Sequence, residues 1–408
     1  MKALVLAGGL PQIVLINQLK ERNVTTVLAD GNANPIARPY ADIFYQVNIF
    51  DIDAIKEIAV REKVDFLITC CADQVLLVVA QVSEMLGLPC YIDYQTAQRV
   101  SDKREMKRIF WANDIPTSRY VQLAELDFEQ IKHLRYPLVI KPVDAYSSRG
   151  VRKVWNEEEL TVAFREAAEI SRASGVIVEE FCEGEEISVD VYVENGKAHL
   201  LCVSNSEKIN DADRFIIFRG RYPAATTPHI MERIQTVAQQ IADAFGLVNS
   251  PMLIQMINNG EDVSVLEFCA RTGGNMKYLL IKYSCGFDVI KAVIDLTMGE
   301  KPTVSIQPAM NNYVVNDFIY CKPGVFDHLE GFDELLEEGV LTEYHCLRPR
   351  GMIIRGVNSS SDRIAGFTIL AKTLEEFNEK HRKVVACTKV IDTEGNDMMR
   401  HDLLPDLV

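Results

Sequence analysis

One lysine in this sequence ends an apolar run and is followed by a loop of small polar residues. Lys141 closes the strand-like run PLVIK, and the loop after it contains Ser147, Ser148, Arg149 and Gly150. Burying an ammonium group is costly unless an anion pairs with it. Backbone N–H groups and hydroxyls in such a loop can bind phosphate oxygens. We therefore predict a phosphate site at Lys141, with an ordinary hairpin turn as the alternative.

A second lysine stands near the start of an expected helix. We expect this helix over residues 101–114, with Ser101 as its N-cap. Lys103 then lies in the first turn, an end of the helix that favours anions rather than cations. This position indicates an anionic ligand, although a solvated surface beside Asp102 and Arg104 is the alternative.

An acidic connection joins two expected strands in the segment VIVEEFCEGEEISVDVYV, residues 176–193. Glu179 and Glu180 end the first apolar run, and Glu186 begins an alternating strand. A carboxylate at such a point can accept hydrogen bonds from ribose hydroxyls. The backbone of Glu180 and Cys182 can contact the edge of an adenine ring. A solvated acidic turn is the alternative interpretation.

A predicted hairpin brings two oxygen-bearing side chains together. The strands PMLIQMI and DVSVLEF flank the turn NNGE, whose Asn259-Gly260 pair is a hairpin signal. Gln255 and Glu267 should then lie side by side. Mg²⁺ prefers one or two protein oxygens and completes its shell with water and phosphate. Arg271 follows Glu267 by four residues and is expected at the mouth of the same site.

The elements that must position these residues begin with a doubly wound unit. Residues 1–95 alternate short apolar strands with amphipathic helices, which predicts a small parallel sheet. Its first turn, AGGLPQ, departs from G-x-G-x-x-G, although Asp30 stands where a ribose-binding acid would. We interpret this as a structural turn and keep a nicotinamide-dependent oxidoreductase as an alternative. The rest of the chain mixes strands and helices, so the fold class is α/β and α+β.

The composition limits the partners of the protein. The 408 residues include 43 Lys and Arg against 58 Asp and Glu, a formal net charge of −15. This argues against binding to nucleic acid or to anionic membranes. The ten cysteines contain no CxxC pair, which argues against zinc. We find no signal peptide and no apolar run of the length that a membrane helix needs, and we expect a cytoplasmic protein with reduced thiols.

The motifs, taken in order, resemble the ATP-grasp superfamily of carboxylate–amine ligases. They are SDK opening a helix, VIKP with its Ser/Gly loop, VEEFCEGEE and LEFCARTGG. The resemblance is closest to single-chain relatives of the large subunit of carbamoyl-phosphate synthetase. It implies a Rossmann-like domain over 1–98, a two-lobed ATP-grasp domain over 99–305 with a hinge near 179–186, and an α+β domain over 306–408.

The resemblance also implies a role for each motif residue. Lys103 and Lys141 would contact ATP phosphates, and the mobile loop would be formed by Ser147, Ser148, Arg149 and Gly150. The adenine and ribose contacts would come from Glu179, Glu180, Phe181, Cys182 and Glu186. Gln255 and Glu267 would hold Mg²⁺, with Mn²⁺ as the alternative metal. Arg271 would act with Lys141 as a catalytic residue that holds the transferred phosphoryl group.

One residue departs from the family pattern. The motif E-x-N-x-R reads Glu267, Phe268, Cys269, Ala270, Arg271 here. Cysteine is a poor Mg²⁺ ligand because the ion prefers hard oxygen. A catalytically weak ATP-binding protein is therefore one alternative to a ligase.

The reaction implied is ATP-dependent activation of a small carboxylate as an acyl phosphate, which an amine then attacks. A bicarbonate-phosphorylating enzyme is the other alternative. Small-molecule carboxylates and amines are the expected partners, and the resemblance allows a homodimer because many members pair. The substrate candidates are Lys208, Arg219 and Asn275, and the further basic candidates Arg214, Arg221 and Lys277 lie near them in the sequence. In the last domain, Arg355 and Arg363 flank GVNSSSD, which we interpret as the edge of a lid or, alternatively, as a turn.

Overall fold

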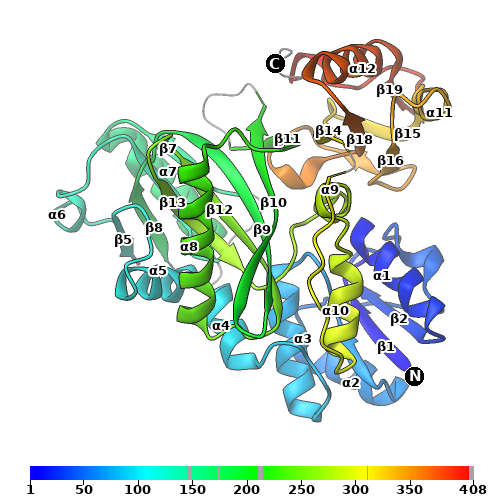
Figure 1. The fold of residues 1–408 in the computed structure, drawn as a ribbon, viewed down its shortest axis with the longest axis horizontal. Coiled ribbons are helices and arrows are strands. Elements are labelled where there is room, and N and C mark those ends of the chain that lie inside the picture. The colour runs from blue at the N-terminus through cyan, green and yellow to red at the C-terminus, as the bar shows by residue number, and fades with distance from the viewer. Residues whose placement is uncertain (145–148, 172–174, 210–214, 310, 404–408) are drawn as a thin grey trace.

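The structure is a computed structural model that describes residues 1–144, 149–171, 175–209, 215–309 and 311–403. Its N-terminal part is a four-stranded parallel sheet in the order β3-β2-β1-β4, as the alternating pattern predicts (Figure 1). The elements are β1 Lys2–Leu6, α1 Leu10–Glu21, β2 Thr25–Asp30, η1 Arg38–Tyr40, β3 Ile43–Gln46, α2 Ile52–Glu62, β4 Phe66–Ile68 and α3 Asp73–Leu86. Strands β1, β2 and β4 are largely buried because helices cover both faces of the sheet.

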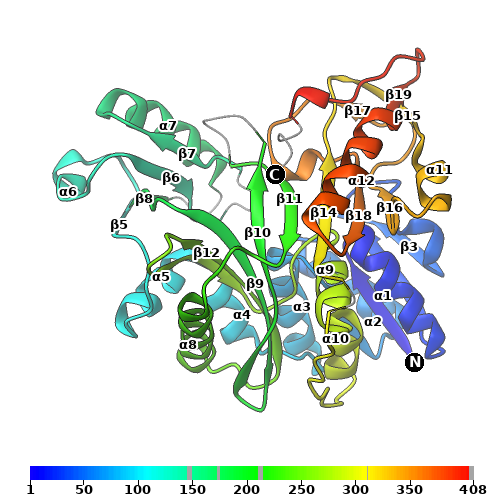
Figure 2. The same cartoon turned by 45° about the horizontal axis from the view of Figure 1, so that its top comes forward.

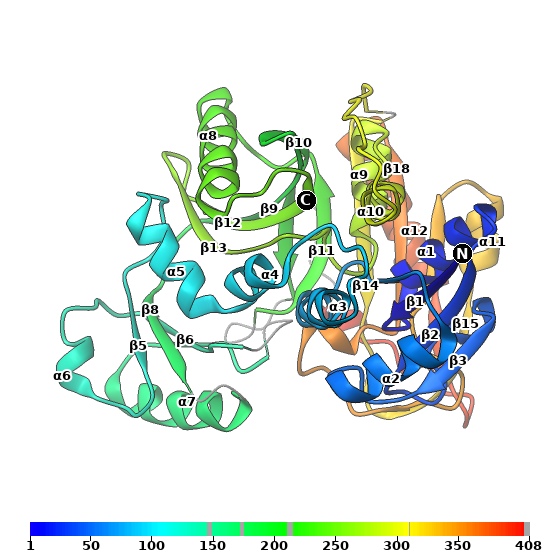
Figure 3. The same cartoon turned by 90° about the horizontal axis from the view of Figure 1, so that it is seen from below.

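Two consecutive helices lead from this sheet toward the rest of the molecule. They are α4 Tyr94–Ser101 and α5 Lys103–Ala112, and Figure 3 shows α3 and α4 between the N-terminal sheet and the largest sheet. The expectation that Ser101 caps a helix is wrong, since Ser101 is the last residue of α4. Asp102 is the N-cap instead, because its carboxylate accepts a hydrogen bond of 2.8 Å from the backbone N–H of Arg104.

A small lobe follows and carries its own antiparallel sheet in the order β5-β8-β6-β7. Its elements are β5 Tyr120–Leu123, α6 Phe128–Ile131, β6 Leu138–Pro142, β7 Arg152–Val154, α7 Glu157–Ile170 and β8 Val176–Glu180. Leu160 and Phe164 of α7 pack on Leu138, Ile140 and Val178 of the sheet. Figure 2 shows this lobe standing apart from the N-terminal sheet, with the largest sheet between them.

The largest sheet has eight strands in the order β13-β12-β9-β10-β11-β14-β18-β16, and every neighbouring pair is antiparallel. Its elements are β9 Glu185–Glu194, β10 Lys197–Lys208, β11 Ile217–Tyr222, α8 Pro228–Phe245, β12 Ser250–Asn258, β13 Val263–Cys269, β14 Tyr313–Ile319, β16 Glu343–Cys346 and β18 Ala365–Ala371. The pairing of β11 with β14 makes the sheet continuous across residue 305. The domain boundaries at 98 and 305 stay predictions.

The remaining elements lie outside the eight-stranded sheet, and three of them form a separate sheet in the order β17-β15-β19. They are α9 Lys277–Cys285, α10 Val289–Thr297, β15 Gly324–Glu330, α11 Phe332–Glu337, β17 Ile353–Ile354, η2 Ser360–Asp362, α12 Leu374–Cys387, β19 Lys389–Asp392 and η3 His401–Leu403. Leu15 and Leu19 of α1 share one buried core with Val289 and Val293 of α10, which fixes the N-terminal unit against α10. No helix in the described ranges has the length and apolar character needed to cross a membrane.

Candidate active site

A cavity of about 530 Å³ opens where the three parts of the chain meet. The N-terminal unit contributes Gly9 to Gln12 and Cys71, and the C-terminal strands contribute Asn316 and Phe318. Eight of the candidate site residues named from the sequence line this cavity. They are Lys103, Gln255, Glu267, Cys269, Arg271, Asn275, Lys277 and Arg363. Segments separated by more than 150 residues in sequence therefore converge on one space.

The predicted hairpin forms, and it brings the two proposed metal ligands together. Gln255 of β12 and Glu267 of β13 are Cα partners on adjacent antiparallel strands. The turn between the strands is closed by a hydrogen bond of 3.2 Å from Asn259 N to the carbonyl of Asp262. The amide Nε2 of Gln255 donates to Glu186 Oε1 at 3.1 Å, so its oxygen takes no part in that bond.

These side chains fit a hard divalent cation. An amide oxygen and a carboxylate on neighbouring strands are the ligand type that Mg²⁺ prefers, and water and phosphate would complete the shell. The described residues contain no group of three or more His, Cys, Asp and Glu side chains that could hold a metal ion. A metal here would therefore depend on Gln255 and on ligands from outside the protein. Cys269 lines the same cavity, but its sulfur is too soft for Mg²⁺.

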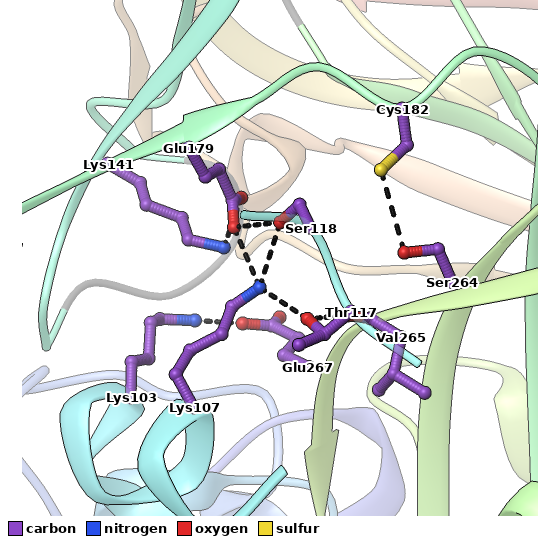
Figure 4. A network of polar contacts seen from close by, with 10 residues as sticks. All are labelled: Lys103, Lys107, Thr117, Ser118, Lys141, Glu179, Cys182, Ser264, Val265 and Glu267. Carbon is purple, nitrogen blue, oxygen red and sulfur yellow. Dashed lines mark hydrogen bonds and ion pairs between the residues drawn. The ribbon is translucent and has the colours of Figure 1, made fainter. Parts of the chain in front are cut away.

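Two lysines of helix α5 point toward glutamate carboxylates, Lys103 toward Glu267 and Lys107 toward Glu179 (Figure 4). Lys103, the first residue of the helix, forms an ion pair with Glu267. Lys107 lies one turn further along the helix, and its side chain is only 1% exposed. Lys107 was not predicted from the sequence as a site residue. Its spacing could have indicated that it is buried, because positions 103, 107 and 110 share one face of a helix and Phe110 is a core residue.

Lys141 is the penultimate residue of strand β6, which ends at Pro142 rather than at the lysine as expected. Its partner in the structure is Glu179 of β8. Lys141 Nζ lies 2.5 Å from Glu179 Oε1, and Lys107 Nζ lies 2.8 Å from Glu179 Oε2. Ser118 also donates to Glu179 Oε2 at 2.8 Å. Burial alone would raise the pKa of Glu179, but the two ammonium groups outweigh burial and hold this pKa well below its usual range. Glu179 is thus a buried anion shared by two cations.

Comparison with known proteins identifies the fold around these residues. An ATP-grasp domain model matches residues 134–278. The mitochondrial carbamoyl-phosphate synthase (ammonia) of Aquarana catesbeiana is 24% identical over 291 residues, which are 67% of this chain and 19% of that protein. The solved L-amino acid ligase from Bacillus licheniformis superposes with a TM-score of 0.80 over 96% of this chain and 99% of that one, at 18% identity. Residues 134–278 of this chain therefore form an ATP-grasp domain.

A second curated relative aligns with about half of this chain. The 3-methyl-D-ornithine–L-lysine ligase of Methanosarcina acetivorans is 28% identical over 193 residues, which are 47% of each protein. The chain spans about half the length of this relative and about a fifth of the synthase. The predicted ATP-grasp fold with mixed α/β architecture is confirmed.

The connection predicted to bind adenine joins the small lobe of the ATP-grasp domain to the largest sheet. Phe181 N donates to Pro137 O at 3.0 Å, and Cys182 Sγ donates to Ser264 Oγ at 3.5 Å. The carboxylate of Glu180 pairs with Arg135 at 3.3 Å. This pairing leaves the backbone, rather than the Glu180 side chain, as the part of this residue suited to an adenine contact.

The ribose candidate Glu186 is the second residue of strand β9 and already has two partners. Its carboxylate accepts hydrogen bonds from Lys208 and from Gln255. Lys208, predicted as a substrate residue, therefore pairs with the predicted ribose-binding acid. Both residues are absent from the cavity lining, but Gln255 connects them to it.

The loop after Lys141 is described only in part. Ser147 and Ser148 lie outside the described residues, whereas Arg149 is exposed and Gly150 is half-buried. Gly150 has a φ of +72°, in the left-handed region that favours glycine. A Cβ atom there would lie 2.7 Å from Ile170 Cδ1 and 3.0 Å from Pro142 Cγ, so the end of the loop requires glycine.

The proposal of Arg219 as a substrate residue is wrong. Its side chain is fully buried and forms two contacts with Asp317, at 2.6 Å through Nε and 2.8 Å through Nη2. Glu207 adds a further contact to Arg219 at 3.4 Å and pairs with Arg221 at 2.7 Å. Arg219 does not line the cavity, because strand β14 supplies its counter-ion.

Of the other basic candidates, some line the cavity and others do not. Arg214 lies outside the described residues, and Arg355 is exposed and does not line the cavity. Lys277 lines the cavity, where its ammonium group donates to Ser204 Oγ at 2.5 Å and lies 3.5 Å from Asp190. Arg363 also lines the cavity, and its guanidinium lies 3.7 Å from the centroid of the Phe318 ring. 

The first glycine turn is held by its own carboxylate. Asp30 Oδ2 accepts from Gly8 N at 2.7 Å, and Asp30 Oδ1 accepts from Asn32 N at 2.7 Å. A Cβ on Gly8 would lie 2.5 Å from Pro35 Cβ. These contacts favour the structural interpretation of the turn over a dinucleotide site.

Proposed function

We propose that this protein is an ATP-dependent ligase that activates a small carboxylate as an acyl phosphate for attack by an amine. The observation that carries the proposal is the convergence of Lys103, Gln255, Glu267 and Arg271 on one cavity. Relatives named as a carbamoyl-phosphate synthase and a lysine ligase support the same chemistry.

In the first step, a carboxylate oxygen of the substrate attacks the γ-phosphorus of ATP and ADP leaves. Lys103 and Lys141 would hold the phosphate oxygens, and Arg271 would hold the transferred phosphoryl group. Their positive charges offset the charge that develops during transfer. A Mg²⁺ ion on Gln255 and Glu267 would supply further charge neutralisation when bound.

In the second step, the amine attacks the acyl carbon and inorganic phosphate leaves as the amide forms. A free carboxylate resists this attack because oxide is a poor leaving group, whereas phosphate departs readily. The cavity would hold the acyl phosphate away from bulk water, which would otherwise hydrolyse it. Asn275, Lys277 and Arg363 line the cavity and are the candidates for holding the two organic substrates.

The test is a coupled assay of ADP release with pooled amino acids and small carboxylates. The active carboxylate is then labelled with ¹⁸O, and one label should appear in the released phosphate. Lys141→Ala and Glu267→Ala should lower ADP release by roughly a hundredfold or more. Release at the wild-type rate in both variants, or the absence of label in phosphate, would contradict the proposal.

Two alternatives are separated by the same assay. The synthase relative favours bicarbonate as a second candidate for the phosphorylated group. ADP release that depends on bicarbonate and on no organic carboxylate would support it. Cys269 favours a nucleotide binder with little turnover, which would bind ATP but release no ADP with any pooled substrate.

A further inference from the structure

The ammonium group of Lys107 has more hydrogen-bond partners than that of Lys141. Its ammonium group donates to Thr117 Oγ1 at 2.6 Å and to Ser118 Oγ at 3.1 Å, and it lies 2.8 Å from Glu179 Oε2. An ammonium group has three donors, so all of them are engaged. Thr117 is fixed in turn, because its hydroxyl donates to the carbonyl of Val265 at 2.7 Å. 

Lys141 shares the same carboxylate but is held by fewer contacts. Among the described residues, Glu179 Oε1 is the only partner that its ammonium group has, at 2.5 Å. Lys141 stands at the end of β6 and is 9% exposed, against 1% for Lys107. Figure 4 shows the two lysines approaching Glu179 from different elements, with Lys107 rising from α5. Lys141 is therefore the cation that can leave Glu179.

The charges of this cluster do not balance. Two ammonium groups surround one carboxylate, and all three side chains are at least nine-tenths buried. A buried excess of positive charge is unfavourable unless an anion approaches it. A phosphate group next to Lys141 would supply that anion. If Lys141 turns toward the phosphate, Glu179 keeps Lys107 as its counter-ion and no buried charge is left unpaired.

We propose that Lys107 is a positioning residue that stays on Glu179 and thereby frees Lys141 to bind a phosphate oxygen. The proposal rests on the proposed function, since it needs a nucleotide at this site. Without Lys107, moving Lys141 to phosphate would leave Glu179 buried and unpaired. The free-energy cost of that unpaired charge would lower the affinity for the nucleotide, although Lys107 itself would not contact the nucleotide.

The test is a double-mutant cycle on the affinity for Mg-ADP, measured by calorimetry. Lys107→Met should weaken binding by about tenfold or more, since a buried carboxylate loses a charged partner when Lys141 moves. The same substitution in a Lys141→Met background should cost little more, because Lys107 acts through Lys141. Arg108→Met, on the exposed side of the same helix, is the matched control and should bind as wild type does.

A merely structural role for Lys107 predicts a different pattern. It would lower the unfolding midpoint but leave the affinity of the folded protein unchanged, or its effects would add to those of Lys141→Met. Either result would overturn the proposal. If wild-type protein bound no Mg-ADP at all, the proposed function would fail as well, so the two failures are distinguishable.

A measurement on the wild-type protein covers the case in which Lys107→Met does not fold. Burial lowers the pKa of Lys107 to about 8, with Glu179 partly offsetting the burial and Lys141 adding to it. The titratable groups facing Lys107 are Glu179, Lys141, Cys182 and Tyr120. Mg-ADP affinity should fall as pH rises from 7 to 9, whereas adenosine, which lacks phosphate, should show no such fall. Equal trends for the two ligands would contradict the proposal.

Discussion

Lys103 and Glu267 form an ion pair that joins the first turn of α5 to strand β13 at the cavity. The carboxylate of Glu267 is also the group that we assign to a metal ion, so an ammonium group and a metal compete for it. Lys103→Met should therefore weaken ATP affinity but lower the Mg²⁺ concentration for half-maximal ADP release by roughly threefold to tenfold. A Mg²⁺ titration at saturating ATP measures this, with Arg104→Met as the control. An unchanged or raised Mg²⁺ requirement would contradict the assignment.

The hairpin and the strand-end lysine could be predicted because their signals are local. Asn259-Gly260 fixes the turn, and the turn fixes which residues of β12 and β13 stand opposite each other. Lys141 was recognisable because an apolar run ends on it. In both cases the residues that decide the geometry lie within a few positions of the site.

The misjudged residues depend on contacts that are distant in sequence. Arg219 is buried because β11 pairs with β14, which brings Asp317 opposite it, and nothing near residue 219 indicates this partner. Lys107 is buried because α5 packs its polar end against Glu179 of the small lobe. Ser101 and Asp102 are both good N-caps, and only the close succession of two helices decides between them.

Cys269 occupies the position that the resemblance to the motif E-x-N-x-R assigns to asparagine. If an oxygen ligand is what this site lacks, Cys269→Asn should lower the Mg²⁺ concentration needed for half-maximal activity by about threefold or more. Cys269→Ala is the control, since it removes sulfur without adding oxygen, and its Mg²⁺ requirement should match wild type. A large loss of activity in Cys269→Ala would instead indicate that the thiol itself takes part in the reaction.

The buried carboxylate of Glu179 should contribute to stability in a way that depends on pH. Glu179→Gln leaves Lys107 and Lys141 without their anion and should cost about 3–5 kcal/mol in the free energy of unfolding at pH 7. The pKa of Glu179 is lower in the folded protein than in the unfolded chain, so its stabilisation is present above the unfolded value and is lost as pH falls. The difference in unfolding free energy between wild type and Glu179→Gln should therefore stay constant from pH 7 to about pH 5 and narrow as pH falls below the unfolded value of 4.5. Urea unfolding at several pH values measures it, and a difference that stays constant below pH 4.5 would contradict this account.

Arg219 should behave as a structural residue rather than a substrate residue. Burial would raise the pKa of Asp317, but Arg219 outweighs burial and lowers that pKa to about 2. Arg219→Met leaves this carboxylate with the His381 ring, 3.1 Å away, in place of a guanidinium group, and should cost about 3–5 kcal/mol of stability. Arg221→Met, which breaks a more exposed pair, should cost about 1 kcal/mol or less. If Arg219→Met instead raised the KM for one substrate and left the stability unchanged, Arg219 would have to be a substrate residue.

Gly150 tests whether the loop after Lys141 depends on one backbone conformation. Gly150→Ala places a methyl group in the left-handed region and against Ile170 and Pro142, so it should cost about 1–3 kcal/mol in unfolding free energy. Gly246 has a similar φ of +68°, and no atom lies within 4 Å of the position that its Cβ would take. Gly246→Ala therefore introduces backbone strain without a steric clash and should lower the free energy of unfolding by about 1 kcal/mol. Because Gly150 returns the chain from the loop to β7, its substitution should also weaken Mg-ADP binding, whereas Gly246→Ala should not. Equal effects of the two substitutions on both stability and binding would show that the contacts with Ile170 and Pro142 do not constrain the loop.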